Sequence, residues 1–124
     1  MQLDEIINYF KQTYPDKKIV LLPEKEPKEI ICEVDPSFLH PEYNHAIAAI
    51  KSSEPHYHKH TVETYKVLRG KLKLNVDGGQ VELREGEEYT TTPEQIHFAE
   101  GDFTLVAVDS KPGWTPEDHF LVES

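Results

Sequence analysis

Residues 55–70 read PHYHKHTVETYKVLRG, a stretch that combines closely spaced histidines with a glutamate. His56 and His58 are separated by one residue, so on a strand both imidazoles leave the same face. Glu63 follows His58 by five residues, an odd step that puts it on the opposite face of an unbroken strand. The three side chains can meet only if the chain bends between residues 59 and 62. The stretch therefore predicts a strand, a bend and a second strand.

Downstream of this stretch, residues 71–84 alternate apolar and polar side chains around a turn signal at residues 77–79. This pattern predicts a β-hairpin with one buried face. Further turn signals recur roughly every 7 to 9 residues, among them Gly101-Asp102, and residues 103–108 form another apolar run. Many short strands separated by regular turns predict a β-sandwich or a β-barrel.

Upstream of it, the chain begins with a different periodicity. Leu3, Ile6, Ile7 and Phe10 stand at helical spacing. We expect residues 1–17 to form an N-terminal extension whose helix ends before Pro15, and whose apolar stripe covers either its own sheet or that of a partner. Shorter signals follow: strands over residues 19–22, 30–34 and 46–50, the last buried on both faces, and a loop over residues 36–44.

Composition narrows the range of partners. Thirteen lysines and arginines against 23 aspartates and glutamates give a net charge of −10, so there is no basic surface for nucleic acid. No apolar run approaches the roughly 20 residues that span a bilayer, which argues against a membrane protein. Cys32 is the only cysteine, so no intrachain disulfide can form, and we expect a cytoplasmic protein.

Two groups of spaced residues carry a family resemblance: His56-x-His58-x4-Glu63-x6-Gly70 and then Gly86-x10-His97. Over residues 46–108 this pattern resembles the two motifs of the cupin superfamily. It departs from them where Ile50 replaces the leading glycine of the first motif, and where Thr92, Glu94 and Gly101 replace Pro, Gly and Asn of the second. The resemblance implies an all-β cupin jelly-roll barrel with a short N-terminal α-helix, as a single domain over residues 1–124.

In cupins the residues at the four ligand positions bind one divalent metal ion in the barrel mouth. The resemblance gives this role to His56, His58, Glu63 and His97. Three neutral imidazoles and one carboxylate form a borderline-soft donor set that suits Fe, Mn, Ni, Zn, Cu or Co. The alternative is a metal-free cupin in which these side chains satisfy one another.

Tyr65 lies on the face of Glu63, one pleat deeper into the strand. Its hydroxyl can orient a ligand, donate a proton or hold Glu63 in place, and the alternative is a core tyrosine with a bonded hydroxyl. Glu63 and Tyr65 are therefore the candidate catalytic residues.

The resemblance favours a metal-dependent enzyme that acts on a small polar substrate, with oxygenase and sugar-type isomerase chemistry both open. The alternative is a non-catalytic module that binds a small ligand, because a fold does not fix a function. Cupins commonly pair, so a homodimer is expected.

Several other side chains have simpler expectations. Trp114 is expected to cover a barrel end, with stacking on a ligand as the alternative. Phe98 and Phe103 are expected in the core, and Arg69 at a solvated strand end, with binding of a substrate carboxylate or phosphate as the alternative. The remaining histidines are expected to be ordinary surface or core residues: His40, His45, His60 and His119.

Overall fold

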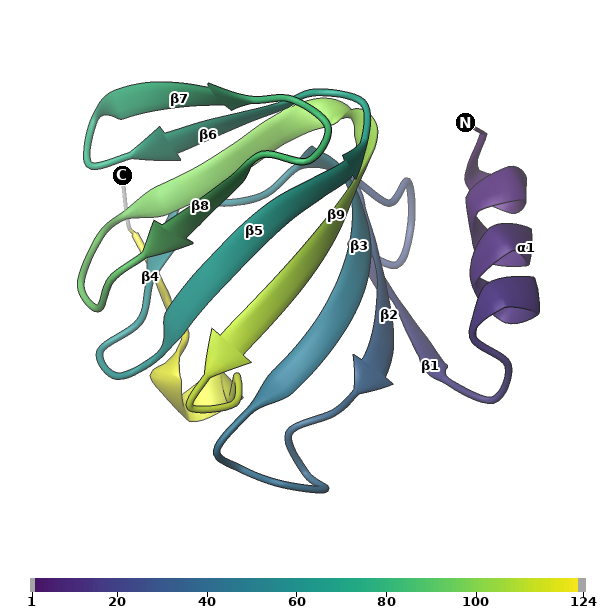
Figure 1. Cartoon of the computed structure of the whole chain (residues 1–124), viewed down its shortest axis with the longest axis horizontal. Coiled ribbons are helices and arrows are strands. Elements are labelled where there is room, and N and C mark those ends of the chain that lie inside the picture. The colour runs from purple at the N-terminus through teal and green to yellow at the C-terminus, as the bar shows by residue number, and fades with distance from the viewer. Residues whose placement is uncertain (1, 123–124) are drawn as a thin grey trace.

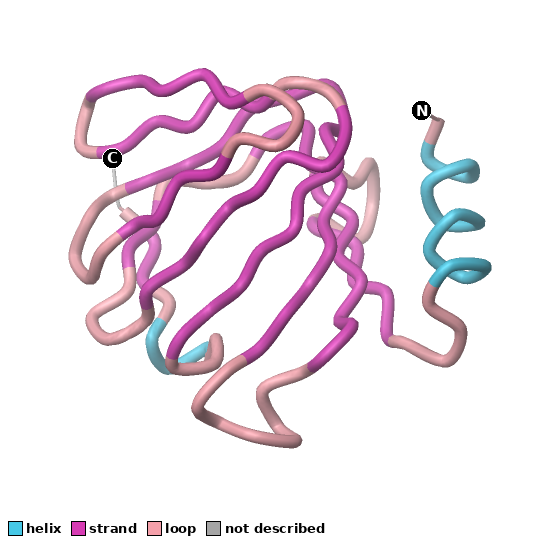
Figure 2. Tube along the Cα trace, in the orientation of Figure 1, coloured by secondary structure: helices cyan, strands magenta, loops and turns pink. Residues whose placement is uncertain are grey.

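The computed structural model describes residues 2–122, in which ten antiparallel strands form one curled sheet with an α-helix beside it (Figure 1). Loops and one 3-10 turn, η1, make up the rest of the trace (Figure 2). The elements in chain order are α1 (Leu3–Thr13), β1 (Lys18–Leu22), β2 (Glu29–Asp35), β3 (Asn44–Ser52), β4 (His56–Tyr57), β5 (Val62–Arg69), β6 (Leu72–Val76), β7 (Gly79–Leu83), β8 (Glu88–Thr91), β9 (His97–Lys111), η1 (Pro116–Asp118) and β10 (Phe120–Leu121). The mostly-β fold with a short N-terminal helix confirms the predicted fold class. Within residues 2–122, no helix is both long and apolar enough to cross a bilayer.

The long strand β9 organises the sheet, because it pairs with four other strands. Its first part, residues 97–101, pairs with β6, at His97 with β4 and at Glu100 with the end of β3, whereas its second part pairs with β3 and β5. A Cβ at Gly101 would lie 2.9 Å from the carbonyl oxygen of Ile50, so the close approach of β9 to β3 requires glycine there. The predicted turn at Gly101-Asp102 is therefore wrong: the glycine marks a bend inside a continuous strand.

One apolar core fills the inside of the curled sheet. Strand side chains alternate between the two faces, and the buried inward set comes from five strands, β3, β5, β6, β7 and β9. Its buried members are Ala48, Ile50, Tyr65, Val67, Leu72, Leu74, Val76, Leu83, Ala99 and Val106. The same inward alternation carries Glu63 and Tyr65 on β5 toward the inside, which is how the fold positions the candidate site.

A second core lies between the outer face of the sheet and helix α1 (Figure 1). Ile6 and Phe10 of the helix are fully buried against the side chains that β2, β3 and β9 direct outward, Ile30 and Cys32 among them. Burial of side chains of this size contributes about 1.5–3 kcal/mol each. The apolar stripe of the helix therefore covers the protein's own sheet, which decides between the two alternatives predicted for it.

Two predicted core aromatics lie at the margins. Phe103 is half-buried at the edge of the helix-side core, where its backbone φ of 51° follows the bend in β9. Phe98 is half-buried and, in the part of the chain that the structure describes, belongs to neither core. Strand alternation explains why Phe98 lies outside the inner core, because His97 and Ala99 on either side of it occupy the inward positions.

The predicted hairpin is confirmed as β6 and β7, joined through Asp77 and Gly78. Both turn residues have positive φ, 48° and 83°, as two-residue hairpin turns of type I′ require. We expect Gly78→Ala to lower the free energy of unfolding by about 1–2 kcal/mol, because a side chain disfavours this left-handed conformation. Gly79→Ala is the matched control, since its φ is not positive. Equal losses in urea denaturation of the two variants would contradict the turn assignment.

Candidate metal centre

The bend predicted after His58 is present, and an aspartate far along the chain holds it. The carboxylate of Asp118 accepts hydrogen bonds from the backbone amides of Lys59 at 2.8 Å and of His60 and Thr61 at 3.0 Å. Burial opposes ionisation of Asp118, but these amide donors outweigh it and lower the pKa of the carboxyl. The bend reverses the direction of the chain, so that Glu63 on β5 faces His56 on β4 and His58 just after β4.

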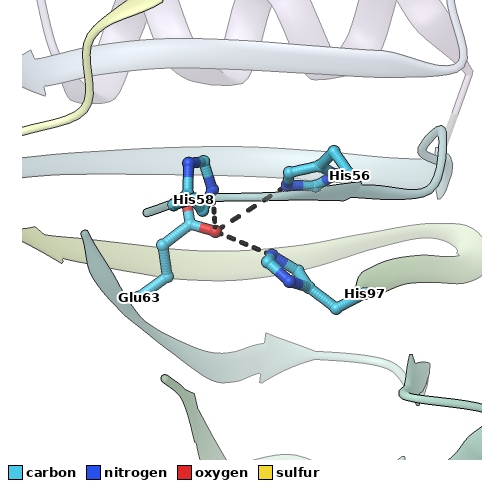
Figure 3. Close-up of side chains that lie close together, drawn as sticks. All are labelled: His56, His58, Glu63 and His97. Carbon is cyan, nitrogen blue, oxygen red and sulfur yellow. Dashed lines mark hydrogen bonds and ion pairs between the residues drawn. The ribbon is translucent and has the colours of Figure 1, made fainter. Parts of the chain in front are cut away.

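Four donor side chains meet at one point inside the sheet (Figure 3). The Oε1 atom of Glu63 lies 3.0 Å from Nε2 of His58, 2.9 Å from Nε2 of His97 and 3.9 Å from Nε2 of His56. All four residues are buried, and their ligand atoms lie within 4.8 Å of one another. His56 and His97 stand opposite each other in the pairing of β4 with β9. The fold thus brings together all four residues that the sequence predicted as ligands.

Backbone carbonyls fix how each imidazole is protonated. Nδ1 of His56 lies 2.8 Å from the carbonyl oxygen of Glu54, Nδ1 of His58 lies 2.6 Å from that of Asp118, and Nδ1 of His97 lies 3.0 Å from that of Gln95. A carbonyl oxygen only accepts hydrogen bonds, so each Nδ1 carries the proton. In the neutral ring Nε2 is then an unprotonated donor of electron pairs, as in metal-bound histidines whose other nitrogen is held from outside.

Three such nitrogens around one carboxylate oxygen require a positive charge between them. Burial works against ionisation of Glu63, but its contacts with the imidazoles of His56, His58 and His97 outweigh burial and hold its pKa well below the usual range. Burial also opposes protonation of His58, but the hydrogen bond with Glu63 outweighs it and raises the His58 pKa. The centre therefore attracts either protons or a metal cation.

The donor spacing fits a transition-metal ion. Neighbouring ligands at right angles, with bonds of about 2.1 Å, lie about 3.0 Å apart. The separations of 2.9 and 3.0 Å from Glu63 to His97 and His58 match that spacing. The residues that could hold the ion are the four in Figure 3.

Tyr65 is placed as the sequence predicted, next to Glu63 on the inner face of β5. Its hydroxyl donates a hydrogen bond of 3.0 Å to Oε1 of Glu63. Burial, together with the negative charge of Glu63, raises the pKa of Tyr65 well above its ordinary value. The hydroxyl is thus protonated and directed at the carboxylate oxygen that faces the histidines.

Sequence reasoning missed Glu29, the first residue of β2. Ile31, two positions later, packs on the inner core, so Glu29 shares the inward face of the strand. Burial raises the Glu29 pKa to about 7, and repulsion by Glu63 and Glu54 adds to the effect. Two carboxyls of one interior therefore differ in protonation near neutral pH, Glu63 being ionised and Glu29 partly protonated.

Sequence reasoning also missed His119, which was expected to be an ordinary residue. Its ring lies 4.6 Å from that of His56 and 5.6 Å from that of His58, measured between centroids. Burial and the neighbouring imidazoles lower the His119 pKa to about 4. Trp114 lies beside it, with ring centroids 5.6 Å apart. No spacing rule links residue 119 to the motif, because the contact is made by the C-terminal segment folding back.

The other histidines lie outside the centre, as predicted. His40 pairs with Asp35 and His45 with Asp109, each at 2.7 Å, and His60 is exposed in the bend. Arg69 is exposed at the end of β5, which confirms the solvated strand end.

Comparison with solved structures shows the same architecture in proteins of low sequence identity. The nucleoside dehydratase Pac13 of Streptomyces aligns with a TM-score of 0.76 at 11% identity, over 89% of this chain and 88% of that one. KdgF from Halomonas sp. aligns with a TM-score of 0.66 at 17% identity, over 80% and 89%. Oxalate decarboxylase from Bacillus subtilis aligns with a TM-score of 0.72 at 15% identity, over 88% of this chain but only 31% of the larger protein.

Sequence comparison gives the family directly. No curated protein matches the chain. The family model of the cupin domain, however, matches residues 45–111, a little over half of the 124 residues, and contains all four donor side chains. With the curled sheet, the cluster of three histidines and one glutamate, and this match in agreement, the chain belongs to the cupin family.

Proposed function

We propose that this cupin binds one divalent transition-metal ion through His56, His58, Glu63 and His97 and is a metal-dependent enzyme acting on a small polar substrate. The observation that carries the proposal is the convergence of three Nε2 atoms, each unprotonated when its ring is neutral, on one carboxylate oxygen. Borderline-soft ligands of this kind accept Fe, Mn, Ni, Zn or Cu.

The bound ion would supply Lewis-acid polarisation of a substrate oxygen. Tyr65 holds Glu63 by its 3.0 Å hydrogen bond and keeps a proton next to the reacting region. Glu29, with a pKa of about 7, can give or take a proton at neutral pH. The burial of all four donors keeps bulk water away from them. We therefore propose Glu63 and Tyr65 as catalytic residues, with Glu29 as a further candidate for proton transfer.

Metal content tests this proposal. Protein purified without added metal should contain about one transition-metal ion per chain by elemental analysis. Iron would favour oxygenase chemistry, whereas zinc, nickel or manganese would favour an isomerase. If the protein neither carries an ion nor takes one up in calorimetric titration, the proposal of a metal-dependent enzyme is wrong.

The second candidate is a non-catalytic module that binds a small ligand. One observation favours it: the hydroxyl proton of Tyr65 is engaged by Glu63, and the raised pKa of Tyr65 makes this proton harder to transfer. A metal-loaded protein that binds ligands tightly but turns none of them over would support this candidate.

Metal affinity should fall as the pH is lowered. A protonated imidazole cannot ligate, and each one lowers the affinity about tenfold per pH unit below its pKa. Because the Glu63 contact raises the His58 pKa, the decline should begin above the ordinary histidine value of about 6.5. Titration with Zn²⁺ at pH 8, 7 and 6 measures it, with His60→Ala as a control that keeps the native profile. A constant affinity over this range would argue against histidine ligation.

We also propose that the protein is a cytoplasmic homodimer, as the family resemblance and the single cysteine suggest. Light scattering should then give about twice the chain mass of 14.3 kDa. Because the helix stripe packs on its own sheet, the dimer contact would involve other surfaces.

A further inference from the structure

The C-terminal segment lies along the edge of the metal centre. β10 pairs with β4, so that Phe120 is opposite Tyr57 and Leu121 is opposite His56. The carbonyl oxygen of Asp118 accepts the Nδ1 proton of His58 at 2.6 Å. A segment that is held at two points beside the donor histidines forms part of the wall around any ligand bound there.

His119 in this segment presents a hydrogen-bond donor. Nε1 of Trp114 lies 3.4 Å from Nδ1 of His119, and an indole nitrogen only donates, so Nδ1 of His119 accepts. The neutral ring then carries its proton on Nε2, the opposite tautomer to the three predicted ligands. No described residue bonds to this Nε2, and no buried side-chain nitrogen of residues 2–122 lacks a partner, so the Nε2–H group is reachable from solvent.

Trp114 presents an aromatic surface next to that donor. Its backbone is fixed at both ends, because its amide donates to Oδ1 of Asn44 at 2.6 Å and its carbonyl accepts from the Ser37 hydroxyl at 2.8 Å. The residue nevertheless remains 37% exposed. An exposed indole on a fixed backbone is suited to packing against a flat ring while its edge stays polar.

We propose that Trp114 and His119 form the ligand-recognition wall of the site: the indole packs against a ring-shaped, oxygen-rich and uncharged ligand, and His119 Nε2–H donates a hydrogen bond to one of its oxygens. This inference rests on the proposed function, because the metal centre would hold the other end of the ligand. His119 is not one of the four convergent donors and stacks beside His56. The net charge of −10 disfavours anionic ligands.

Fluorescence provides a direct test, because Trp114 is the only tryptophan in the chain. Uridine and D-xylose serve as ring-shaped probes, and xylitol is the open-chain control of D-xylose. With Zn²⁺-loaded protein, at least one ring-shaped probe should change the Trp114 emission and bind at least five times more tightly than xylitol. The absence of any such change or preference overturns the proposal.

Trp114→Leu and His119→Phe separate recognition of the probe from metal binding, with probe affinity measured by calorimetry. Trp114→Leu should abolish the preference for ring-shaped probes over xylitol. His119→Phe should lower the affinity for the preferred ring-shaped probe about tenfold. His119→Gln, which retains an N–H donor, should restore part of that affinity. Both Trp114→Leu and His119→Phe should bind Zn²⁺ within about twofold of the native protein. Loss of Zn²⁺ affinity in His119→Phe would make His119 a ligand and overturn its place in the wall.

The outcomes also separate this inference from the proposed function. If native protein takes up no metal, the proposed function fails, and probe binding to metal-free protein still measures the wall. If metal binds but neither variant changes the discrimination between the ring-shaped probes and xylitol, the wall is wrong and the metal centre stands.

Discussion

His97→Ala should lower the affinity for Zn²⁺ by more than about 100-fold, because loss of the outer partner of a metal ligand alone costs about 10–100-fold and this substitution removes the ligand itself. His97 is buried and its Nε2 lies 2.9 Å from Oε1 of Glu63, the shortest of the three histidine contacts to that oxygen. Calorimetric titration with Zn²⁺ at pH 8 measures the change.

The matched control is His60→Ala. His60 lies in the same motif but is exposed in the bend, and its side chain is outside the four-donor cluster. It should keep the native affinity for Zn²⁺. The two variants should also keep the native circular dichroism spectrum, which excludes misfolding as the cause. An equal affinity of His97→Ala and His60→Ala would show that the cluster does not hold the ion.

The motif residues were predictable because their geometry is local or follows from strand alternation. The spacing of His56 and His58 fixes their common face, and the odd step to Glu63 required the bend that the structure shows at residues 59–61. Tyr65 follows Glu63 on the same face for the same reason. His97 required the family resemblance, since only the pairing of β9 with β4 brings it opposite His56.

The remaining parts of the site depend on tertiary contacts that no local pattern encodes. Asp118 and His119 reach the centre because the C-terminal segment returns along β4, across a separation of about 60 residues from His58. Glu29 is the first residue of β2. The sequence predicted this strand only from the apolar run at residues 30–34, which begins after Glu29. A charged residue at an inward position could have been suspected from alternation with Ile31, but its altered pKa depends on distant Glu63 and Glu54.

At Gly101 a local pattern was present, but it predicted the wrong structure. A glycine followed by aspartate is typical of a turn, yet β9 continues through it. The position requires glycine because β3 approaches closely, and the bend lets one strand pair with β6 and then with β5. That change of partner brings the start of β9, and with it His97, to the centre.

Asp118→Ala should lower the free energy of unfolding by about 2–4 kcal/mol. Its carboxylate satisfies three backbone amides in the bend, and each buried donor left without a partner costs about 1–3 kcal/mol. Lys59 and His60 are exposed, so water can replace part of the lost bonding there, whereas Thr61 is buried. Urea denaturation at pH 7 measures the loss. Glu117→Ala, an exposed neighbour in η1, should cost less than about 0.5 kcal/mol.

The same substitution tests whether the bend serves the metal centre as well as the fold. The Asp118 carbonyl that holds His58 is backbone and survives the change, so a loss of Zn²⁺ affinity of about 10–100-fold would come from the altered bend between His58 and Glu63.

The stabilising effect of Asp118 should depend on pH in one direction only. Because the folded-state pKa of Asp118 is lowered, its stabilising effect is complete above the ordinary aspartate value of about 3.9 and disappears as the pH falls through the folded-state value. A stability difference between native and Asp118→Ala protein that stayed constant into strong acid would mean that the ionised carboxylate does not hold the bend.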